Sequence, residues 1–151
     1  MMIVEVALGL GLFVSIAFSE LLGLAAGGMV VPGYLAMEIQ YPGRLMMTFL
    51  CAMLTYVLVQ AGSRFALIYG RRRTAATILV GFILRYFMQN AAAAYLPVVP
   101  GSFDIIGHII PGLIAIWMAR QGIIETISTS VMAAVVVRLC LILLVGWEWI
   151  S

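Results

Sequence analysis

Six apolar runs occupy most of the chain, and they constrain its fold more than any other feature. A helix that crosses a bilayer needs about 17–25 mostly apolar residues. Hydrophobic residues make up 65% of the chain and charged residues only 9%, too few to cover a surface that faces water. The sequence therefore predicts an all-α integral membrane protein in which residues 1–151 form a single transmembrane domain. The runs cover residues 3–19, 21–37, 45–61, 74–96, 105–119 and 123–147.

The second and fifth runs are short, rich in glycine and interrupted by a Pro-Gly pair. Each is predicted to be a kinked span or a re-entrant segment. Because proline lacks an N–H and clashes with the carbonyl four residues earlier, that carbonyl is free to meet a ligand. Alternatively, a half-helix starts at the proline and its N–H groups face an anion, or the glycines simply allow close helix packing. The residues concerned are Gly28, Pro32 and Gly33 in the second run and Gly107, Pro111 and Gly112 in the fifth.

An internal repeat relates the two interrupted runs. A shift of 79 positions places Gly28 on Gly107 and the first Pro-Gly pair on the second, and it carries the third run into the sixth. The fold is therefore predicted to contain two three-segment repeats, about residues 1–66 and 70–148. If each half crosses the membrane three times, the halves have opposite orientations, as in inverted-repeat transporters. If the interrupted runs are re-entrant, each half crosses twice and the repeat is parallel.

The arginines predict the orientation, because short cytoplasmic loops carry an excess of positive charge. Four arginines lie between the third and fourth runs, so that loop is predicted to be cytoplasmic. With six spans, both termini and Arg44 are outside and Arg120 is inside. With four spans and two re-entrant runs, both termini are inside while Arg44 and Arg120 are outside. The six-span arrangement puts more arginine inside and is preferred. The four loop arginines are Arg64, Arg71, Arg72 and Arg73.

Two further arginines lie deep in apolar runs, Arg85 in the fourth and Arg138 in the sixth. Ionisable residues at membrane depth are candidate functional groups. One interpretation pairs each arginine with a glutamate of another helix, and the other has both arginines face a polar path for an anionic chain. The glutamates near the ends of the runs are Glu20, Glu38 and Glu125.

Catalysis by the chain alone finds little support. His108 is the only histidine, and no Ser-His-Asp set, metal cluster, Walker loop or GxGxxG motif accompanies it. The two cysteines, Cys51 and Cys140, lie inside apolar runs and are interpreted as small hydrophobic residues. The net charge of +2 is too small to indicate nucleic-acid binding. We therefore expect no catalytic residue, cofactor or metal in this chain.

Four motifs follow one another along nearly the whole chain: 29–36 (MVVPGYLA), 54–57 (LTYV), 69–77 (YGRRRTAAT) and 110–115 (IPGLIA), the last continuing to 120–122 (RQG). With these motifs in this order, the chain resembles the C subunit of bacterial poly-γ-glutamate synthase, the CapC or PgsC family of capsule biosynthesis membrane proteins. Arg73 and Thr74 stand where the family pattern has a lysine and an aromatic residue.

The resemblance implies a multi-pass subunit of the poly-γ-glutamate synthase complex in the bacterial cytoplasmic membrane. A B-type ligase subunit would bind ATP and a divalent metal for amide ligation, and an A-type subunit would act in transport at the outer face. The present chain would support the ligation and give the anionic polymer a route through the lipid bilayer. The candidate residues for the polymer path or for partner docking are Gly28, Pro32, Gly33, Gly107, Pro111, Gly112, Arg71, Arg72, Arg73, Arg85 and Arg138.

Other interpretations stay open on the sequence alone. The chain is alternatively a stand-alone small inverted-repeat transporter or channel for an anion, or an intramembrane enzyme that uses His108. The arginine run, which we expect to dock the ligase or attract nascent polymer, is alternatively a determinant of orientation and nothing more.

Overall fold

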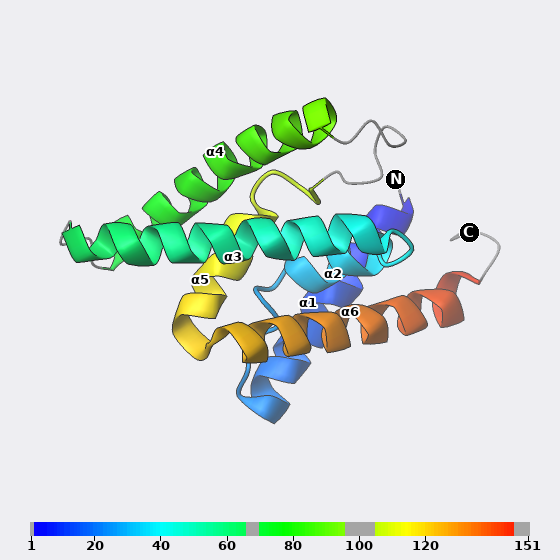
Figure 1. Ribbon diagram of the computed structural model, residues 1–151. Helices are drawn as coiled ribbons and strands as arrows, with labels where there is room; N and C mark the ends of the chain where they lie inside the picture. Colours follow the sequence, from blue (N-terminus) through cyan, green and yellow to red (C-terminus); the bar gives the residue numbers. More distant parts are fainter. Residues whose placement is uncertain (1, 66–69, 96–104, 147–151) are drawn as a thin grey trace.

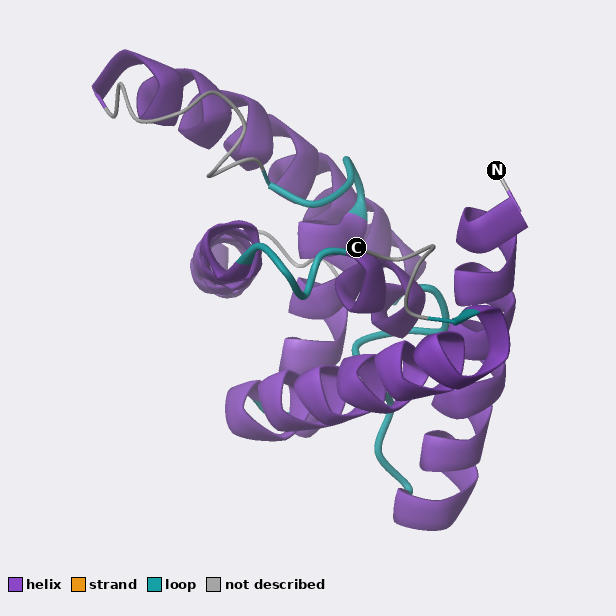
Figure 2. Cartoon of the chain, turned by 90° about the vertical axis from the view of Figure 1, so that its right-hand side faces the viewer, coloured by secondary structure: helices purple, strands orange, loops and turns teal. Residues whose placement is uncertain are grey.

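The computed structural model describes residues 2–65, 70–95 and 105–146 of the chain. Within these ranges the chain forms helices joined by turns and loops, without a strand (Figures 1 and 2). The predicted all-helical fold with six helical segments is therefore confirmed. The helices are α1 (Met2–Leu22), α2 (Val31–Met37), α3 (Pro42–Phe65), α4 (Arg71–Tyr95), α5 (Ile110–Gln121) and α6 (Ile123–Val145).

Four of the helices, α1, α3, α4 and α6, are long and apolar enough to cross a membrane. The other two are too short to do so as helices, since α2 has 7 residues and α5 has 12, whereas a span needs about 20. The second apolar run is helical only in part, because Leu21 and Leu22 end α1 and residues 23–30 follow without a helix. Non-helical backbone is tolerated at membrane depth only where protein or water surrounds it, and residues 26–28 are buried.

The starts of the two short helices have the same local cause. α2 begins one residue before Pro32, and α5 begins one residue before Pro111. Proline is favoured in the first turn, where its missing N–H would have no helical acceptor. Just before these starts, Gly28 has a φ of 121° and Gly107 a φ of 59°, which residues with a side chain rarely adopt. These residues explain why neither helix extends further toward the N-terminus.

The two short helices lie in separate groups of long helices. α2 packs against α1 and α6, whereas α5 packs against α4 and α3 and also touches α6. In Figure 1, α3 crosses in front of α5, and α4 contacts both of these helices. One buried apolar cluster joins Leu35 of α2, Ala52 of α3 and Ile114 of α5, and a second joins Ala7 of α1 to Ala133 of α6. The shortest helices therefore occupy the interior, and the long helices surround them.

The short helices approach long-helix backbones closely at glycines. A Cβ added to Gly11 of α1 would lie 2.6 Å from the nitrogen of Gly33 in α2. A Cβ added to Gly81 of α4 would lie 3.0 Å from the Cα of Gly112 in α5. Small residues at such points let helices approach within backbone contact, which drives association inside a membrane. Each short helix is thus held against a long one where neither has a side chain.

Side-chain hydrogen bonds hold the loop in front of each short helix. Before α2, the Ala25 N–H donates to Oε1 of Gln121 (3.0 Å), and Nε2 of Gln121 donates to the Ala25 carbonyl (2.6 Å). The Thr129 hydroxyl donates to the same carbonyl (3.2 Å). Before α5, the Ile106 N–H donates to the Thr48 hydroxyl (2.9 Å). Backbone groups away from water need such partners, so these contacts fix the two loops.

Replacing Gln121 with alanine is expected to lower the free energy of unfolding by about 1–3 kcal/mol, because the Ala25 N–H loses its partner and the Ala25 carbonyl keeps only Thr129. The control is Ser128→Ala, an exposed hydroxyl that donates within its own helix. The thermal midpoint of each purified variant in detergent measures the effect. Equal midpoints for the two variants would contradict the role of Gln121.

Candidate functional site

The prolines and glycines of the interrupted runs lie at the starts of α2 and α5, inside the molecule. Pro32, Gly33, Pro111 and Gly112 are buried. The atoms nearest to an added Cβ on Gly33 or Gly112 belong to the backbones of α1 and α4, respectively. The described contacts of these two glycines are therefore with protein backbone, which is what close helix packing requires.

Gly28 lies in a different setting from the Pro-Gly pair that follows it. Its carbonyl accepts a hydrogen bond from the Ser15 hydroxyl of α1 (3.3 Å). Together with Ser15, Glu20 and Trp117, it lines a cavity of about 200 Å³. Its counterpart in the second half, Gly107, is half-buried and precedes an exposed His108. The two matched glycines thus have unlike surroundings.

The two deep arginines donate to backbone carbonyls of the short segments. Arg138 of α6 is 9% exposed, and its Nη1 donates to the Ala36 carbonyl in the last turn of α2 (3.4 Å), where the negative end of the helix dipole favours a cation. Nη2 of Arg85 in α4 donates to the Ile105 carbonyl in front of α5 (3.5 Å). Within the described residues, the buried Nε of Arg85 has no hydrogen-bond partner. Each deep arginine therefore touches the backbone of a different interrupted run.

Glu38 is one of the glutamates that the sequence offers as a partner for an arginine. Glu38, just after α2, forms an ion pair with Arg44 in the first turns of α3, with Nη1 and Oε2 2.7 Å apart. The Arg44 guanidinium also lies 4.9 Å from the centre of the Tyr41 ring. The partners are six residues apart in the chain, so a tight turn between α2 and α3 makes this contact.

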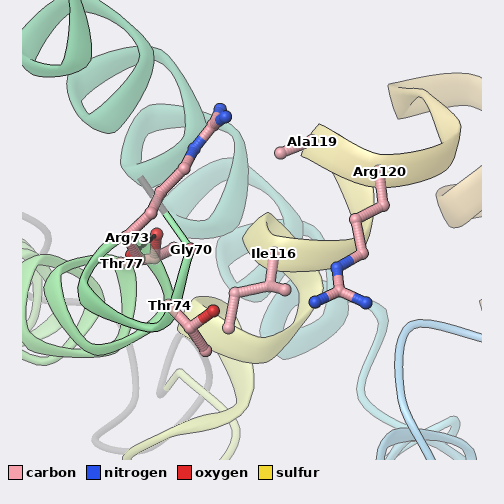
Figure 3. Close-up of a pocket in the computed structure, with 7 residues that line it drawn as sticks. All are labelled: Gly70, Arg73, Thr74, Thr77, Ile116, Ala119 and Arg120. Atoms are coloured by element: carbon pink, nitrogen blue, oxygen red, sulfur yellow. Dashed lines mark hydrogen bonds between the residues drawn. The ribbon is translucent and has the colours of Figure 1, made fainter. Parts of the chain in front are cut away.

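The arginine run at the start of α4 borders a cavity of about 190 Å³ (Figure 3). Arg71 and Arg72 are exposed, whereas Arg73 is half-buried and its Nη2 donates to Oε1 of Gln60 in α3 (2.7 Å). Arg73 and Arg120 both line the cavity, the first from α4 and the second from α5. Arginines of two helices therefore line one cavity, and in Figure 3 their guanidinium groups extend in different directions.

Sequence reasoning assigned no site role to three residues of this cavity, Arg120, Thr74 and Thr77. The Arg120 guanidinium lies 5.4 Å from the centre of the Trp117 ring, and the Thr77 hydroxyl donates to the Arg73 carbonyl of its own helix (2.7 Å). The available signal was orientation, since the preferred six-span arrangement puts Arg120 on the side of the arginine run. The predicted orientation places these residues on one side of the membrane but does not predict that they line one cavity.

His108 and the cysteines form no reactive cluster in the part of the chain that the structure describes. The His108 ring stacks against Phe82 of α4, with ring centroids 6.3 Å apart. Both cysteines are free, and Cys51 is buried. Across residues 2–65, 70–95 and 105–146, no group of three or more His, Cys, Asp or Glu side chains is placed to hold a metal ion. The polar groups that these regions provide for binding are arginine N–H donors and backbone carbonyl acceptors.

These features define a small helical membrane protein with four candidate spans and a basic cavity beside α4. The sequence comparison identifies it further, because the profile of the family described as "Capsule biosynthesis CapC" matches residues 10–127. The chain belongs to this capsule biosynthesis CapC family.

Two relatives support this assignment over most of their length. The chain is 41% identical over 131 residues to the "Capsule biosynthesis protein CapC" of Bacillus anthracis, covering 84% of this chain and 85% of the relative. It is 37% identical over 131 residues to the "PGA biosynthesis protein CapC" of Bacillus subtilis (strain 168), with the same shares covered. No solved structure matches the chain.

Proposed function

We propose that this chain is a membrane subunit of a poly-γ-glutamate capsule synthase in the bacterial cytoplasmic membrane. It supports ATP-dependent amide ligation by a B-type ligase subunit and helps the anionic polymer to cross the bilayer, where an A-type subunit continues its transport. The similarity to two CapC proteins over 84% of the chain carries this proposal. ATP and a divalent metal belong to the ligase subunit in this scheme.

The arginines of the chain fit a supporting role toward a polyanion. Arg71 and Arg72 are exposed at the end of the molecule where α4 begins, so they are free to dock a partner or meet nascent polymer. Arginine suits carboxylates because its planar guanidinium donates two parallel hydrogen bonds. Arg85 and Arg138 contact backbone carbonyls of the interrupted runs, which favours a role in holding those segments in place.

We also propose that the chain is built from two inverted repeats. Matched contacts support this: Gly33 meets α1 next to Gly11, and Gly112 meets α4 next to Gly81. Ser15 in α1 and Arg85 in α4 form another matched pair. Each lies four residues after the glycine of its own helix, Gly11 or Gly81. Ser15 donates to the Gly28 carbonyl and Arg85 to the Ile105 carbonyl, in front of α2 and α5 respectively.

The inverted repeat requires that each half cross the membrane three times, the second crossing being made by a loop and a short helix together. The cavity that Arg73 and Arg120 share favours this arrangement. Four spans with two re-entrant runs would put these two arginines on opposite membrane surfaces, about 30 Å apart across the hydrocarbon core. Six crossings put both on the cytoplasmic side.

Replacing Arg71 and Arg72 together with glutamine is expected to reduce co-purification of the ligase subunit by about tenfold, which corresponds to the loss of about 1.4 kcal/mol of binding free energy. Both side chains are exposed, so folding is not expected to change. The matched control is Arg64→Gln, an exposed arginine at the end of α3. If recovery of the ligase subunit is unchanged while the variant still inserts into the membrane, the arginine run determines orientation and does not dock the ligase.

Reconstitution tests the proposed function directly. Proteoliposomes with the purified chain, ATP, a divalent metal and glutamate are expected to make no polymer until the B-type ligase subunit is added. Omitting the chain from the complete mixture is expected to abolish membrane-associated polymer. Uptake of a small anion by the chain alone would favour the stand-alone transporter instead, and polymer made without the chain would refute a subunit role.

A further inference from the structure

The cavity of about 200 Å³ in front of α2 is lined by an acidic side chain and, among the described residues, by no basic one. Ser15, Ser19 and Glu20 of α1 line it together with Trp117 of α5. In the part of the chain that the structure describes, Glu20 forms no ion pair. The Glu20 carboxylate therefore has no described protein cation as a partner.

The helix dipole of α1 adds to this negative charge. Glu20 lies in the last turn of α1, which contains no basic residue. The carbonyl end of a helix carries partial negative charge, so it favours a cation and disfavours an acid. The loop after α1 runs from this end toward α2 (Figure 1), and it carries the Gly28 carbonyl that Ser15 contacts. A carboxylate at this place is unfavourable unless a cation comes near it.

The cavity also offers neutral groups that suit an ammonium with an anionic neighbour. A primary ammonium has three N–H donors, and the serine hydroxyls and the Glu20 carboxylate have lone pairs that accept them. The indole nitrogen of Trp117 lies toward Gly28, since a Cβ added to that glycine would lie 3.3 Å from Nε1. Arg120, 5.4 Å from the centre of the indole ring, adds positive charge near Trp117. The negative and the positive groups thus lie at different residues of the site.

The size and the opening of the cavity suit one end of a longer molecule. One water takes up about 30 Å³ of liquid, so about 200 Å³ is enough for an amino group, its carbon atom and a carboxylate. Glu20 and Met29 in the lining are exposed, whereas Ser15 and Gly28 are buried. A ligand can therefore insert its charged end and leave the rest outside.

The geometry points to a binding site for a primary ammonium group that has an anionic group beside it, with the ammonium held by Glu20 and Ser19 and the anionic group near Trp117. The amino end of an oligo-γ-glutamyl chain and the headgroup of phosphatidylethanolamine share this chemistry. The oligomer as ligand rests on the proposed function. With six crossings, this end of α1 lies on the cytoplasmic side, where the ligase subunit would supply polymer.

The test uses the full chain in nanodiscs of phosphatidylcholine. Replacing Trp147 and Trp149 with phenylalanine leaves Trp117, one of three tryptophans, as the fluorescent reporter in the cavity. Titration with a γ-linked glutamate oligomer is expected to give a saturable change in fluorescence, with affinity checked by calorimetry. The same oligomer with an acetylated amino end is expected to bind about tenfold more weakly, because acetylation removes the positive charge.

The Glu20→Gln variant separates a direct contact from a general charge effect. Removing an acid makes the chain more positive, so charge alone would strengthen the binding of an anionic oligomer. Loss of the ammonium contact is instead expected to weaken binding about tenfold. The acetylated oligomer lacks that contact, so it is expected to bind Glu20→Gln no more weakly than the parent. The matched control is Glu5→Gln, an exposed acid in the first turn of α1, which is expected to bind like the parent.

A second series raises the mole fraction of phosphatidylethanolamine in the nanodisc without oligomer. A fluorescence change that Glu20→Gln abolishes identifies the lipid headgroup as a ligand of the same site. The site is overturned if Glu20→Gln leaves both responses unchanged, or if it shifts them by the same factor as Glu5→Gln. It is also overturned if the substitution weakens the free and the acetylated oligomer equally. Equal thermal midpoints of the parent and the variants show that weakening is not unfolding.

The site and the proposed function fail separately. The titrations contain neither ligase nor ATP, so binding that depends on Glu20 stands even if the chain is not needed for synthesis. Conversely, if polymer synthesis requires the chain while Glu20→Gln binds oligomer and lipid like the parent, the site is refuted and the subunit role remains.

Discussion

Replacing Gly11 with alanine is expected to lower the free energy of unfolding by about 3 kcal/mol, the upper end of the usual range for overpacked positions. The added Cβ would lie 2.6 Å from the Gly33 nitrogen and 2.7 Å from its Cα. Both atoms are backbone of α2, so no side chain can turn away, and α1 and α2 must separate. The thermal midpoint in detergent and the yield in the membrane fraction measure the loss.

Gly9 on the same helix is the matched control, because a Cβ added there meets no atom within 4 Å. Gly9→Ala is expected to keep or slightly raise the midpoint, since alanine favours a helix over glycine by about 1 kcal/mol. Gly81→Ala repeats the test on α4, where the added Cβ would lie 3.0 Å from the Gly112 nitrogen, and a smaller loss is expected. Equal midpoints for Gly11→Ala and Gly9→Ala would contradict the contact between α1 and α2.

The second large effect concerns orientation and is all-or-none. In a background without Cys51 and Cys140, single cysteines replace Gln40 before α3, Phe65 at the end of α3, and Ala119 near the end of α5, all exposed positions. With six crossings, an impermeant maleimide added to intact cells is expected to label position 40 only. Positions 65 and 119 are expected to react only after the membrane is opened.

Position 119 decides between the two arrangements. Position 65 lies beside the arginine run and is the internal control for the cytoplasmic side, and position 40 is the control for the outer side. If position 119 is labelled in intact cells together with position 40, each half crosses twice and the repeat is not inverted. Polymer output of each single-cysteine protein in cells shows that the labelled species is functional.

Sequence patterns predicted where the helices lie better than they predicted the lengths of the helices or the contacts between them. The runs around α1, α3, α4 and α6 were recognised because about 20 apolar residues with few charges have one stable form in a bilayer. The extent of α2 was not predicted, because residues 23–30 are as apolar as a helix but contain glycines with positive φ. Hydropathy reports where a segment partitions and says nothing about its backbone conformation.

The site was predicted in its residue types and only partly in its arrangement. Arg73 was a candidate, but Arg120, which lines the same cavity, was considered for orientation alone. Arg138 was expected to meet a glutamate or a polar path, and its described bond is to the Ala36 carbonyl, 102 positions away in the chain. A pairing over such a separation depends on how the helices pack, which the order of residues does not reveal.

The amino-acid sequence by itself determined that this protein is helical, resides in a membrane and belongs to the CapC family, because apolar length, charge scarcity and ordered motifs are properties of the chain read along its length. Only the tertiary structure decided that Gln121 holds the loop at Ala25, that Arg138 donates to the Ala36 carbonyl, and that Arg73 and Arg120 line one cavity. These features join residues distant in the chain, and the energy of such contacts exists only once the helices have packed.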